Sequence, residues 1–457
     1  RKSWFVLFVL ALLTVGFVYG GGQGAGETKM VPFWSNEADP NSQEMYRTFV
    51  SEFEAANPNA KIDYVATGGE TTKKALNAIA TGGDLGVFTP DVDTVTKLDA
   101  DGLLLALNEA VDNLGGAERY FYKSHLVNPK GEIIAVPYSQ GGQVHWIRTD
   151  VFAQKGLEVP DPVRGWTWEE CLDAASKASV DTNGDGTIDI YGIGLPVSQV
   201  LVTDYWMFET MWTNGQGFFD KNLDVVCNTP YTAQALEYYD KLLDYAPPGK
   251  VEWGWYDVVD AFANGTVAIG YYEGRILGRI YRNNPGMKGK FATVPLAYNK
   301  DFRKVTFASP DFNVCYSKVK HPDVALKWIE YLQADEQLAR FATTVPGHLV
   351  PPTKPGKDML MTMDVPEIKE NPAVFEVLTG TFEYAWNPWT DAGGLDRANK
   401  RIEKTNILNP YYYLITTKQY PSLAIQKVHL EDQDPAAVTK WMSDSLAADV
   451  AAEKAKR

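Results

Sequence analysis

Apolar residues in the first third of the chain alternate between strand-like and helix-like spacing. Lys29 to Trp34 is a short apolar run, Ser42 to Ala56 carries an apolar stripe at helical spacing, and Lys61 to Ala66 alternates again. The same pattern predicts helices over 71–80 and 93–101 and strands over 86–92 and 133–138. Strands that alternate with helices indicate α/β units, and we expect largely parallel sheets.

Farther along, the pattern becomes mostly helical. Thr167 and Glu170 have the spacing of a capping box and open a helix that runs to Lys177. Trp328 lies among apolar residues at helical spacing, so we assign it to the core. Periodic apolar positions predict four more helices, over 232–245, 256–263, 322–332 and 335–341.

The N-terminal residues have the features of an export signal. Arg1 and Lys2 precede an apolar run from Trp4 to Val18, which is about 15 residues and shorter than the ~20 that span a bilayer. We predict a signal peptide over 1–20, cleaved near Gly20, and a flexible glycine-rich spacer over 21–28. An uncleaved anchor is the alternative. Since no Cys lies near the cleavage point, we expect export to the periplasm or the extracellular space without a lipid anchor.

Charge and cysteine content narrow the class of protein. The 457 residues include 43 basic and 58 acidic side chains, a net charge of -15, and no basic block, so nucleic acid and anionic membrane surfaces are poor partners. Cys171, Cys227 and Cys315 are widely spaced and lie among apolar neighbours. We expect small buried hydrophobic side chains there, although one pair could form a disulfide in an oxidising compartment.

One loop has the spacing of a calcium site. Oxygen-bearing side chains recur at every second position around Gly186, which suits an oxygen-liganded cation. The twelfth position, where a bidentate Glu belongs, is Gly192, and a rigid turn without an ion explains the loop equally well. A structural Ca²⁺ is therefore one of two interpretations, and no other cofactor is required. The candidate ligands are Asp181, Asn183, Asp185, Thr187 and Asp189.

Motifs for catalysis are weak throughout the chain. The five histidines, at positions 125, 145, 321, 348 and 429, form neither an HExxH motif nor a close pair. No Gly-x-Ser-x-Gly sequence is present either. Two carboxylates at the spacing of a glycoside hydrolase remain an open alternative, because the 58 acidic residues offer many combinations.

Aromatic residues are numerous, with 13 Trp and 24 Tyr against five His. Several follow predicted strands, where ligands of α/β sheets bind. A ring can stack on the apolar face of a sugar, while Asp, Asn or Arg bonds to its hydroxyls. Other rings are expected to fill helix interfaces. The aromatic candidates for ligand contact are Trp34, Tyr138, Trp146, Trp206, Trp253, Trp255 and Tyr272. Two charged residues that follow Tyr272, Glu273 and Arg275, are candidates as well.

Several stretches, in their order and spacing, resemble family 1 of the bacterial extracellular solute-binding proteins, the sugar receptors of ABC transporters that include the maltose-binding proteins. The likeness covers nearly the whole mature chain. Two stretches depart from the family pattern. His145-Trp146-Ile147-Arg148 stands where Tyr-Asn often follows the crossing strand, and Tyr272-Glu273-Gly274-Arg275 stands where a Trp commonly follows a later strand. The stretches that carry the resemblance are 49–58, 90–92, 135–138, 150–157, 166–170, 262–269 and 322–332.

The resemblance implies a periplasmic-binding fold of type II, in which two α/β lobes joined by a hinge close on a ligand. It places lobe one at 27–135 plus 305–345 and lobe two at 136–304 plus 346–457. By position, it adds Asn36, Asp93 and Asp311 to the ligand-contact candidates. The resemblance also supports six of the candidates already named as ligand contacts: Trp34, Tyr138, Trp206, Tyr272, Glu273 and Arg275.

From this resemblance we expect a monomeric receptor without enzymatic activity. It would capture a mono- or oligosaccharide and deliver it to the permease subunits of an ABC transporter. Two alternatives remain open. One is a receptor for a non-sugar solute, such as a phosphorylated polyol or a peptide that pairs with Arg275, and the other is a secreted carbohydrate-active hydrolase.

Overall fold

The computed structural model describes residues 27–121, 126–307 and 310–456. The predicted signal peptide over 1–20 and most of the predicted spacer over 21–28 therefore lie outside the described residues. Among the residues that are described, no helix is both long and apolar enough to cross a membrane.

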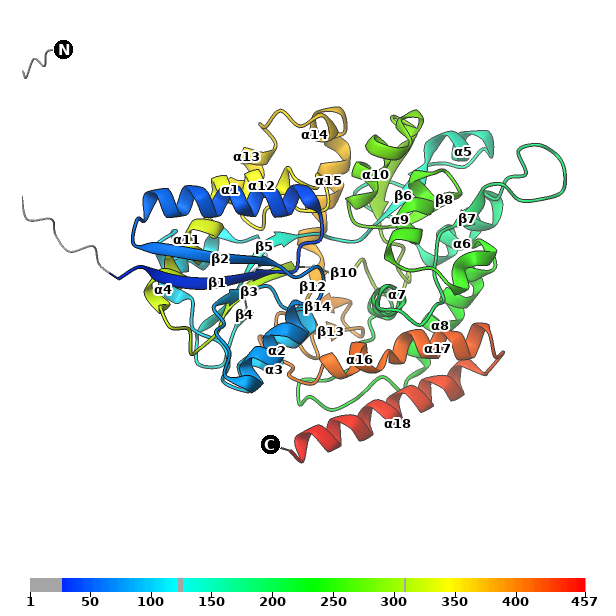
Figure 1. Ribbon diagram of the computed structural model, residues 1–457. Helices are drawn as coiled ribbons and strands as arrows, with labels where there is room; N and C mark the ends of the chain where they lie inside the picture. The colour runs from blue at the N-terminus through cyan, green and yellow to red at the C-terminus, as the bar shows by residue number, and fades with distance from the viewer. Residues whose placement is uncertain (1–26, 122–125, 308–309, 457) are drawn as a thin grey trace, which may run out of the picture.

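A six-stranded sheet forms the centre of what we call the first lobe (Figure 1). Its strand order is β2-β1-β3-β11-β5-β4, so β11 enters the sheet between strands from the N-terminal third. The strands are β1 (Lys29–Ser35), β2 (Ala60–Ala66), β3 (Val87–Phe88), β4 (Leu126–Val127), β5 (Ile133–Gln140) and β11 (Pro310–Cys315).

Helices cover both faces of this sheet. The ring of Trp328 on α11 is fully buried and lies 5.5 Å from Phe33 of β1 and 5.1 Å from Phe53 of α1, centroid to centroid. Its assignment to the core is confirmed. The helices are α1 (Pro40–Ala56), α2 (Thr71–Thr81), α3 (Val95–Ala100), α4 (Asn108–Asp112), α11 (Pro322–Gln333) and α12 (Asp335–Ala342).

A four-stranded sheet of order β7-β8-β6-β9 forms the centre of the second lobe. The predicted capping box is confirmed, since Thr167 accepts from the backbone N–H of Glu170 and the Glu170 side chain accepts from that of Thr167. The strands are β6 (Val144–Arg148), β7 (Tyr191–Ile193), β8 (Val267–Tyr272) and β9 (Phe291–Pro295). The helices are α5 (Thr149–Gln154), α6 (Trp168–Lys177), α7 (Leu201–Trp212), α8 (Pro230–Leu243), α9 (Trp255–Ala263) and α10 (Arg275–Asn283).

The C-terminal part is shared between the lobes. Three helices, α16 (Tyr413–Lys418), α17 (Tyr420–His429) and α18 (Pro435–Lys454), run along one side of the molecule (Figure 1). Here α17 and α18 pack on α8 of the second lobe, while α16 contacts the turn at Val92–Thr94 of the first. The remaining elements are α13 (Lys354–Leu360), α14 (Pro366–Glu370), α15 (Pro372–Gly380), β10 (Thr306–Phe307), β12 (Ala385–Trp386), β13 (Leu395–Asp396) and β14 (Arg401–Ile402).

The expectation of largely parallel sheets is wrong. In the two main sheets only β1–β2, β1–β3 and β7–β8 pair in parallel, and the other pairings are antiparallel. In the first sheet, β11 returns from the second lobe and enters antiparallel to β3, and β5 pairs antiparallel with β11 and with β4. The predicted strand over 86–92 is also shorter, because only Val87–Phe88 pairs and a 3-10 turn begins at Val92.

The chain first crosses between the sheets at residues 141–143, between β5 and β6. The predicted lobe boundary after residue 135 falls inside β5, which runs on to Gln140, and the boundary at 304–305 falls just before β10. All three cysteines are buried and free, which confirms their interpretation as small buried side chains.

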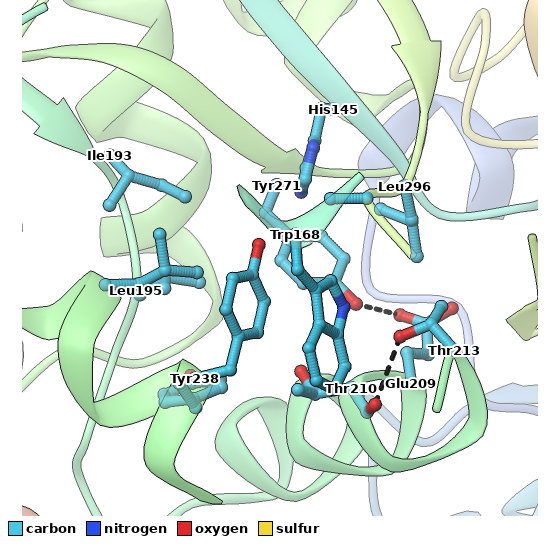
Figure 2. Close-up of a pocket in the computed structure, with 13 residues that line it drawn as sticks. His145, Trp168, Ile193, Leu195, Glu209, Thr210, Thr213, Tyr238, Tyr271 and Leu296 are labelled. Atoms are coloured by element: carbon cyan, nitrogen blue, oxygen red, sulfur yellow. Dashed lines mark hydrogen bonds between the residues drawn. The ribbon is translucent and has the colours of Figure 1, made fainter. Parts of the chain in front are cut away.

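The buried carboxyl group of Glu209 forms hydrogen bonds that connect the second lobe with Thr306 and Phe307, in a segment that crosses between the lobes. Glu209 on α7 accepts hydrogen bonds from the Tyr271 hydroxyl (2.6 Å), the Thr306 hydroxyl (3.0 Å) and the Phe307 amide (2.7 Å). Figure 2 shows Glu209 beside Tyr271, in a small cavity that also contains the stacked rings of Trp168 and Tyr238. Burial raises the pKa of Glu209 to about 8, so this group retains a proton at neutral pH.

Replacing Glu209 with Gln is expected to change how stability depends on pH. In the unfolded chain the carboxyl group ionises near 4.5, whereas in the folded protein its pKa is about 8. Between these values the folded state holds the extra proton, so wild-type stability falls as pH rises, and Glu209→Gln removes that loss. Urea unfolding at about pH 5 and about pH 8 should therefore show the variant gaining on wild type at the higher pH.

Exposed Glu237 on α8 provides the control, because Glu237→Gln should follow the wild-type pH profile. A Glu209→Gln profile parallel to that of wild type would contradict the raised pKa.

Candidate ligand cleft

A cavity of about 330 Å³ lies between the lobes. Its walls come from the ends of β1, β3 and β8, the crossing segments near β5 and β11, and helices α7 and α9. It is therefore assembled from segments that are far apart in the sequence. The lining residues are Asn36, Glu37, Ala38, Pro90, Asp91, Val92, Tyr138, Gln143, Leu201, Tyr205, Trp255, Tyr256, Tyr272, Glu273, Arg275, Phe307, Pro310, Asp311 and His348.

Two carboxyl groups of the first lobe point into a polar part of this cavity. Glu37 accepts from the Tyr138 hydroxyl at 2.9 Å, and Asp311 accepts from the Ser139 hydroxyl at 2.7 Å. Burial raises the pKa of both groups, and the charge of Asp311 raises that of Glu37 further. Carboxyl oxygens accept hydrogen bonds from hydroxyls, which suits a ligand with several hydroxyl groups.

The second lobe contributes a third carboxylate with basic neighbours. Glu273 Oε1 lies 2.6 Å from His348 Nδ1 and 4.0 Å from Arg275 Nε. The amide nitrogen of Gln143 donates to Glu273 Oε2 at 3.4 Å. The amide oxygen of Gln143 is buried and has no hydrogen-bond partner within the described part of the chain. A buried acceptor without a partner is costly, so this oxygen is a candidate to receive a ligand hydrogen.

Aromatic rings form the apolar side of the cavity. Tyr205 stacks on Phe307 with centroids 5.3 Å apart, and Trp255 lies 5.9 Å from both Tyr205 and Tyr272. These contacts hold the rings of Tyr205, Trp255 and Tyr272 in fixed orientations. The cavity therefore combines rigid rings with carboxyl and amide groups.

A close approach of two glycines brings the charged groups together. A Cβ atom at Gly274 would lie 2.0 Å from the carbonyl oxygen of Gly347, so no larger residue fits without movement. Gly347 itself has a φ of 85°, a conformation that favours glycine. Because Gly274 lies between Glu273 and Arg275, and Gly347 precedes His348, this contact places all three side chains at the cavity.

Seven of the twelve predicted contact residues line the cavity, and five do not. Trp146 and Trp206 are fully buried in the second lobe, and Trp206 stacks on Tyr271. Trp34 is partly buried against a first-lobe cluster that contains Phe88, and Trp253 is partly buried against the larger cluster that contains Val267. Asp93 is buried and accepts from the Thr416 hydroxyl. The seven lining residues are Asn36, Tyr138, Trp255, Tyr272, Glu273, Arg275 and Asp311. Their contact with a ligand stays a prediction.

Several lining residues were not among the sequence candidates. Glu37 directly follows Asn36 after β1, so the strand-end argument could have included it. Gln143 directly follows Gly141 and Gly142 in the crossing segment between β5 and β6. This glycine pair could have indicated from the sequence that Gln143 lies near the cleft. His348 lies in the loop between α12 and α13, and no local pattern connects that loop with Glu273.

The loop over 181–189 is closed by its own hydrogen bonds. Asp181 accepts from the amides of Gly184 (2.7 Å) and Gly186 (2.8 Å), and Asp185 accepts from that of Thr187 (2.7 Å). Among the described residues, no group of three or more His, Cys, Asp or Glu side chains is placed to hold a metal ion. These bonds fit the turn interpretation, and calcium binding stays a prediction.

Comparison with known protein families then assigns the chain. The sequence model of the family of bacterial extracellular solute-binding proteins matches residues 39–339 of this chain. The chain belongs to this family. A relative in Escherichia coli strain K12, the periplasmic-binding protein YcjN, is 22% identical over 356 residues, which cover 76% of this chain and 79% of the relative.

Solved structures of this family share the fold. A solute-binding protein from Thermotoga lettingae TMO, bound with alpha-D-tagatose, superposes with a TM-score of 0.72 at 18% identity and covers 92% of this chain and 99% of its own. The maltose-bound MalE3 of T. maritima gives 0.70 at 17% identity, covering 91% and 98%. The type II periplasmic-binding fold predicted from the sequence is confirmed.

Adding a methyl group at Gly274 is expected to destabilise the folded protein. The new Cβ atom would overlap the Gly347 carbonyl, and forced overpacking typically costs about 1–3 kcal/mol. Chemical denaturation of Gly274→Ala should therefore show a lower free energy of unfolding. Gly380 at the end of α15 is the matched control, because no atom lies within 4 Å of a Cβ built there. Equal stability of Gly274→Ala and Gly380→Ala would refute the proposed constraint.

Proposed function

We propose that this protein is the exported substrate-binding component of an ABC transporter and that its ligand is a mono- or oligosaccharide. It acts as a monomer, closes its lobes on the ligand and delivers it to the membrane permease. The observation that carries the proposal is the mixed lining of the cavity between the lobes. Rigid rings face carboxyl groups and an unpartnered amide oxygen there.

This lining suits a sugar for a physical reason. A sugar ring has apolar C–H faces, which stack on aromatic rings such as Trp255 and Tyr272, and a rim of hydroxyls, which bond to groups such as Asp311. The tagatose and maltose complexes of similar proteins support the same ligand class. The periplasmic role in the name of YcjN supports export and transport.

Lobe closure explains how binding is coupled to delivery. Ligand contacts come from Glu37 and Asp311 in the first lobe and from Trp255 and Glu273 in the second. A ligand that touches both sides stabilises the closed arrangement over the open one, and this difference can be recognised by a permease. We propose binding without catalysis, so the ligand should be recovered chemically unchanged.

A carbohydrate panel tests the proposal. Thermal unfolding with neutral mono- and disaccharides should show at least one sugar that raises the melting temperature, because the ligand binds only the folded state. Calorimetry then gives the affinity of that sugar. No stabilisation by any sugar or polyol would overturn the carbohydrate assignment, and reducing ends released from an oligosaccharide ligand would support the hydrolase alternative.

Gln143 provides the site-specific variant. Gln143→Leu removes the unpartnered acceptor and should weaken sugar binding about tenfold, the value of one typical hydrogen bond of about 1.4 kcal/mol. Gln154→Leu on α5 is the matched control, because Gln154 is exposed and outside the cavity. Unchanged affinity in Gln143→Leu would show that this oxygen does not contact the sugar.

Calcium binding by the 181–189 loop is a separate proposal. If the loop binds Ca²⁺ through Asp181, Asp185 and their neighbours, equilibrium dialysis should give lower calcium content for Asp185→Ala than for wild type. Equal calcium content in both would remove the site and leave the hydrogen-bonded turn as the full explanation of the motif.

A further inference from the structure

Three arginines lie on one face of α10. Arg275, Arg279 and Arg282 are spaced by four and three residues, and this spacing aligns side chains along a helix. All three line a second cavity of about 290 Å³, together with Glu37, Ala38, Asp39, Pro40 and Tyr256. This cavity lies between the start of α1 in the first lobe and α9 and α10 in the second.

The second cavity adjoins the ligand cleft and shares part of its lining. Glu37, Ala38, Tyr256 and Arg275 line both cavities. Tyr256 is 56% exposed, although its large ring belongs to a helix whose other aromatic and aliphatic side chains are mostly buried. The Arg279 guanidinium lies over this ring, 5.2 Å from its centroid. A ligand longer than the deep cavity would therefore pass Tyr256 and reach the arginines.

The acidic residues near this second cavity are already engaged. Asp260 pairs with Arg279 Nε at 3.0 Å. Asp39 caps α1 by accepting from the backbone N–H of Asn41 at 2.9 Å. Glu37 is bonded to Tyr138 and faces the deep cavity. Arg282, by contrast, forms no ion pair or hydrogen bond through its side chain within the described residues.

We propose that this second cavity is a subsite for an anionic group and that the ligand is an acidic saccharide. Its neutral part occupies the deep cavity, and a carboxylate or phosphate on the sugar pairs with Arg282 and Arg279. Arginine suits both groups, because its planar donors match the paired oxygens of a carboxylate or phosphate. This inference rests on the proposed carbohydrate-binding function and adds to it the charge of the ligand.

Matched pairs of sugars test the subsite. Calorimetry would compare glucose with glucuronate and glucose 6-phosphate, galactose with galacturonate, and galactobiose with digalacturonate. At least one acidic member should bind about two- to fivefold more tightly than its neutral parent, within the range for exposed charge pairs. This preference should shrink between about 0.01 M and about 1 M salt, where the Debye length falls from about 30 Å to about 3 Å. Preference for the uronates or for the phosphate identifies which anion the site takes.

Substitution of Arg282 completes the test. Arg282→Gln is expected to remove most of the acidic preference and to leave neutral sugars unaffected, and Arg279→Gln/Arg282→Gln should abolish the preference. Arg303→Gln, which removes an equal charge from an exposed position outside both cavities, should behave as wild type.

Three outcomes would overturn the proposal in distinguishable ways. Binding of neutral sugars with no acidic preference would remove the subsite and leave the proposed function intact. Equal weakening of neutral and acidic sugars in Arg282→Gln would show that this charge acts on lobe closure and not on the ligand. Binding of no saccharide at all would remove the proposed function together with the subsite.

Discussion

The cleft depends on the backbone contact between Gly274 and Gly347. Strand β8 ends at Tyr272, and the turn that follows can approach the loop after α12 only because neither glycine has a side chain. That approach puts Glu273 2.6 Å from His348 and keeps Arg275 at the start of α10. The charged groups that a ligand would meet are thus positioned by rigid backbone, which lowers the cost of ordering them during binding.

Burial of its carboxyl groups also affects the chemistry of the cleft. Glu37 and Asp311 lie where water is largely excluded, so the charged form of each is disfavoured and the pKa is raised. Glu273 has His348 and Arg275 beside it. The deep cavity offers carboxyl groups that can bond to ligand hydroxyls. Arg282 lies farther out, at the second cavity, and its side chain has no ion-pair partner among the residues that the structure describes.

Local pattern was sufficient for most of the fold. The apolar stripe on α1, the capping box at Thr167 and the periodicity around Trp328 each depend on neighbours within a turn or two, and each was predicted correctly. Sheet direction was predicted wrongly, because it depends on where β11 inserts after the chain has passed through the second lobe. Trp146 shows the same limit, since nothing local distinguishes a ring in a strand core from a ring at a strand end. His348 and Glu273 meet only in the folded chain.

Coupling between the cleft and the hinge follows from Glu209. Its carboxyl group holds Thr306 and Phe307 of β10, and the ring of Phe307 in turn lines the cleft and stacks on Tyr205. The single proton of the Thr306 hydroxyl is shared between Glu209 and the carbonyl of Gln143 in the first crossing segment, which lies 3.1 Å from the hydroxyl oxygen. One buried group therefore joins α7 to two crossing segments and to a wall of the cavity. A ligand that presses on Phe307 or bonds to Gln143 acts directly on the segments that connect the lobes, so the contacts that recognise the ligand and the contacts that fix the lobe arrangement share the same residues.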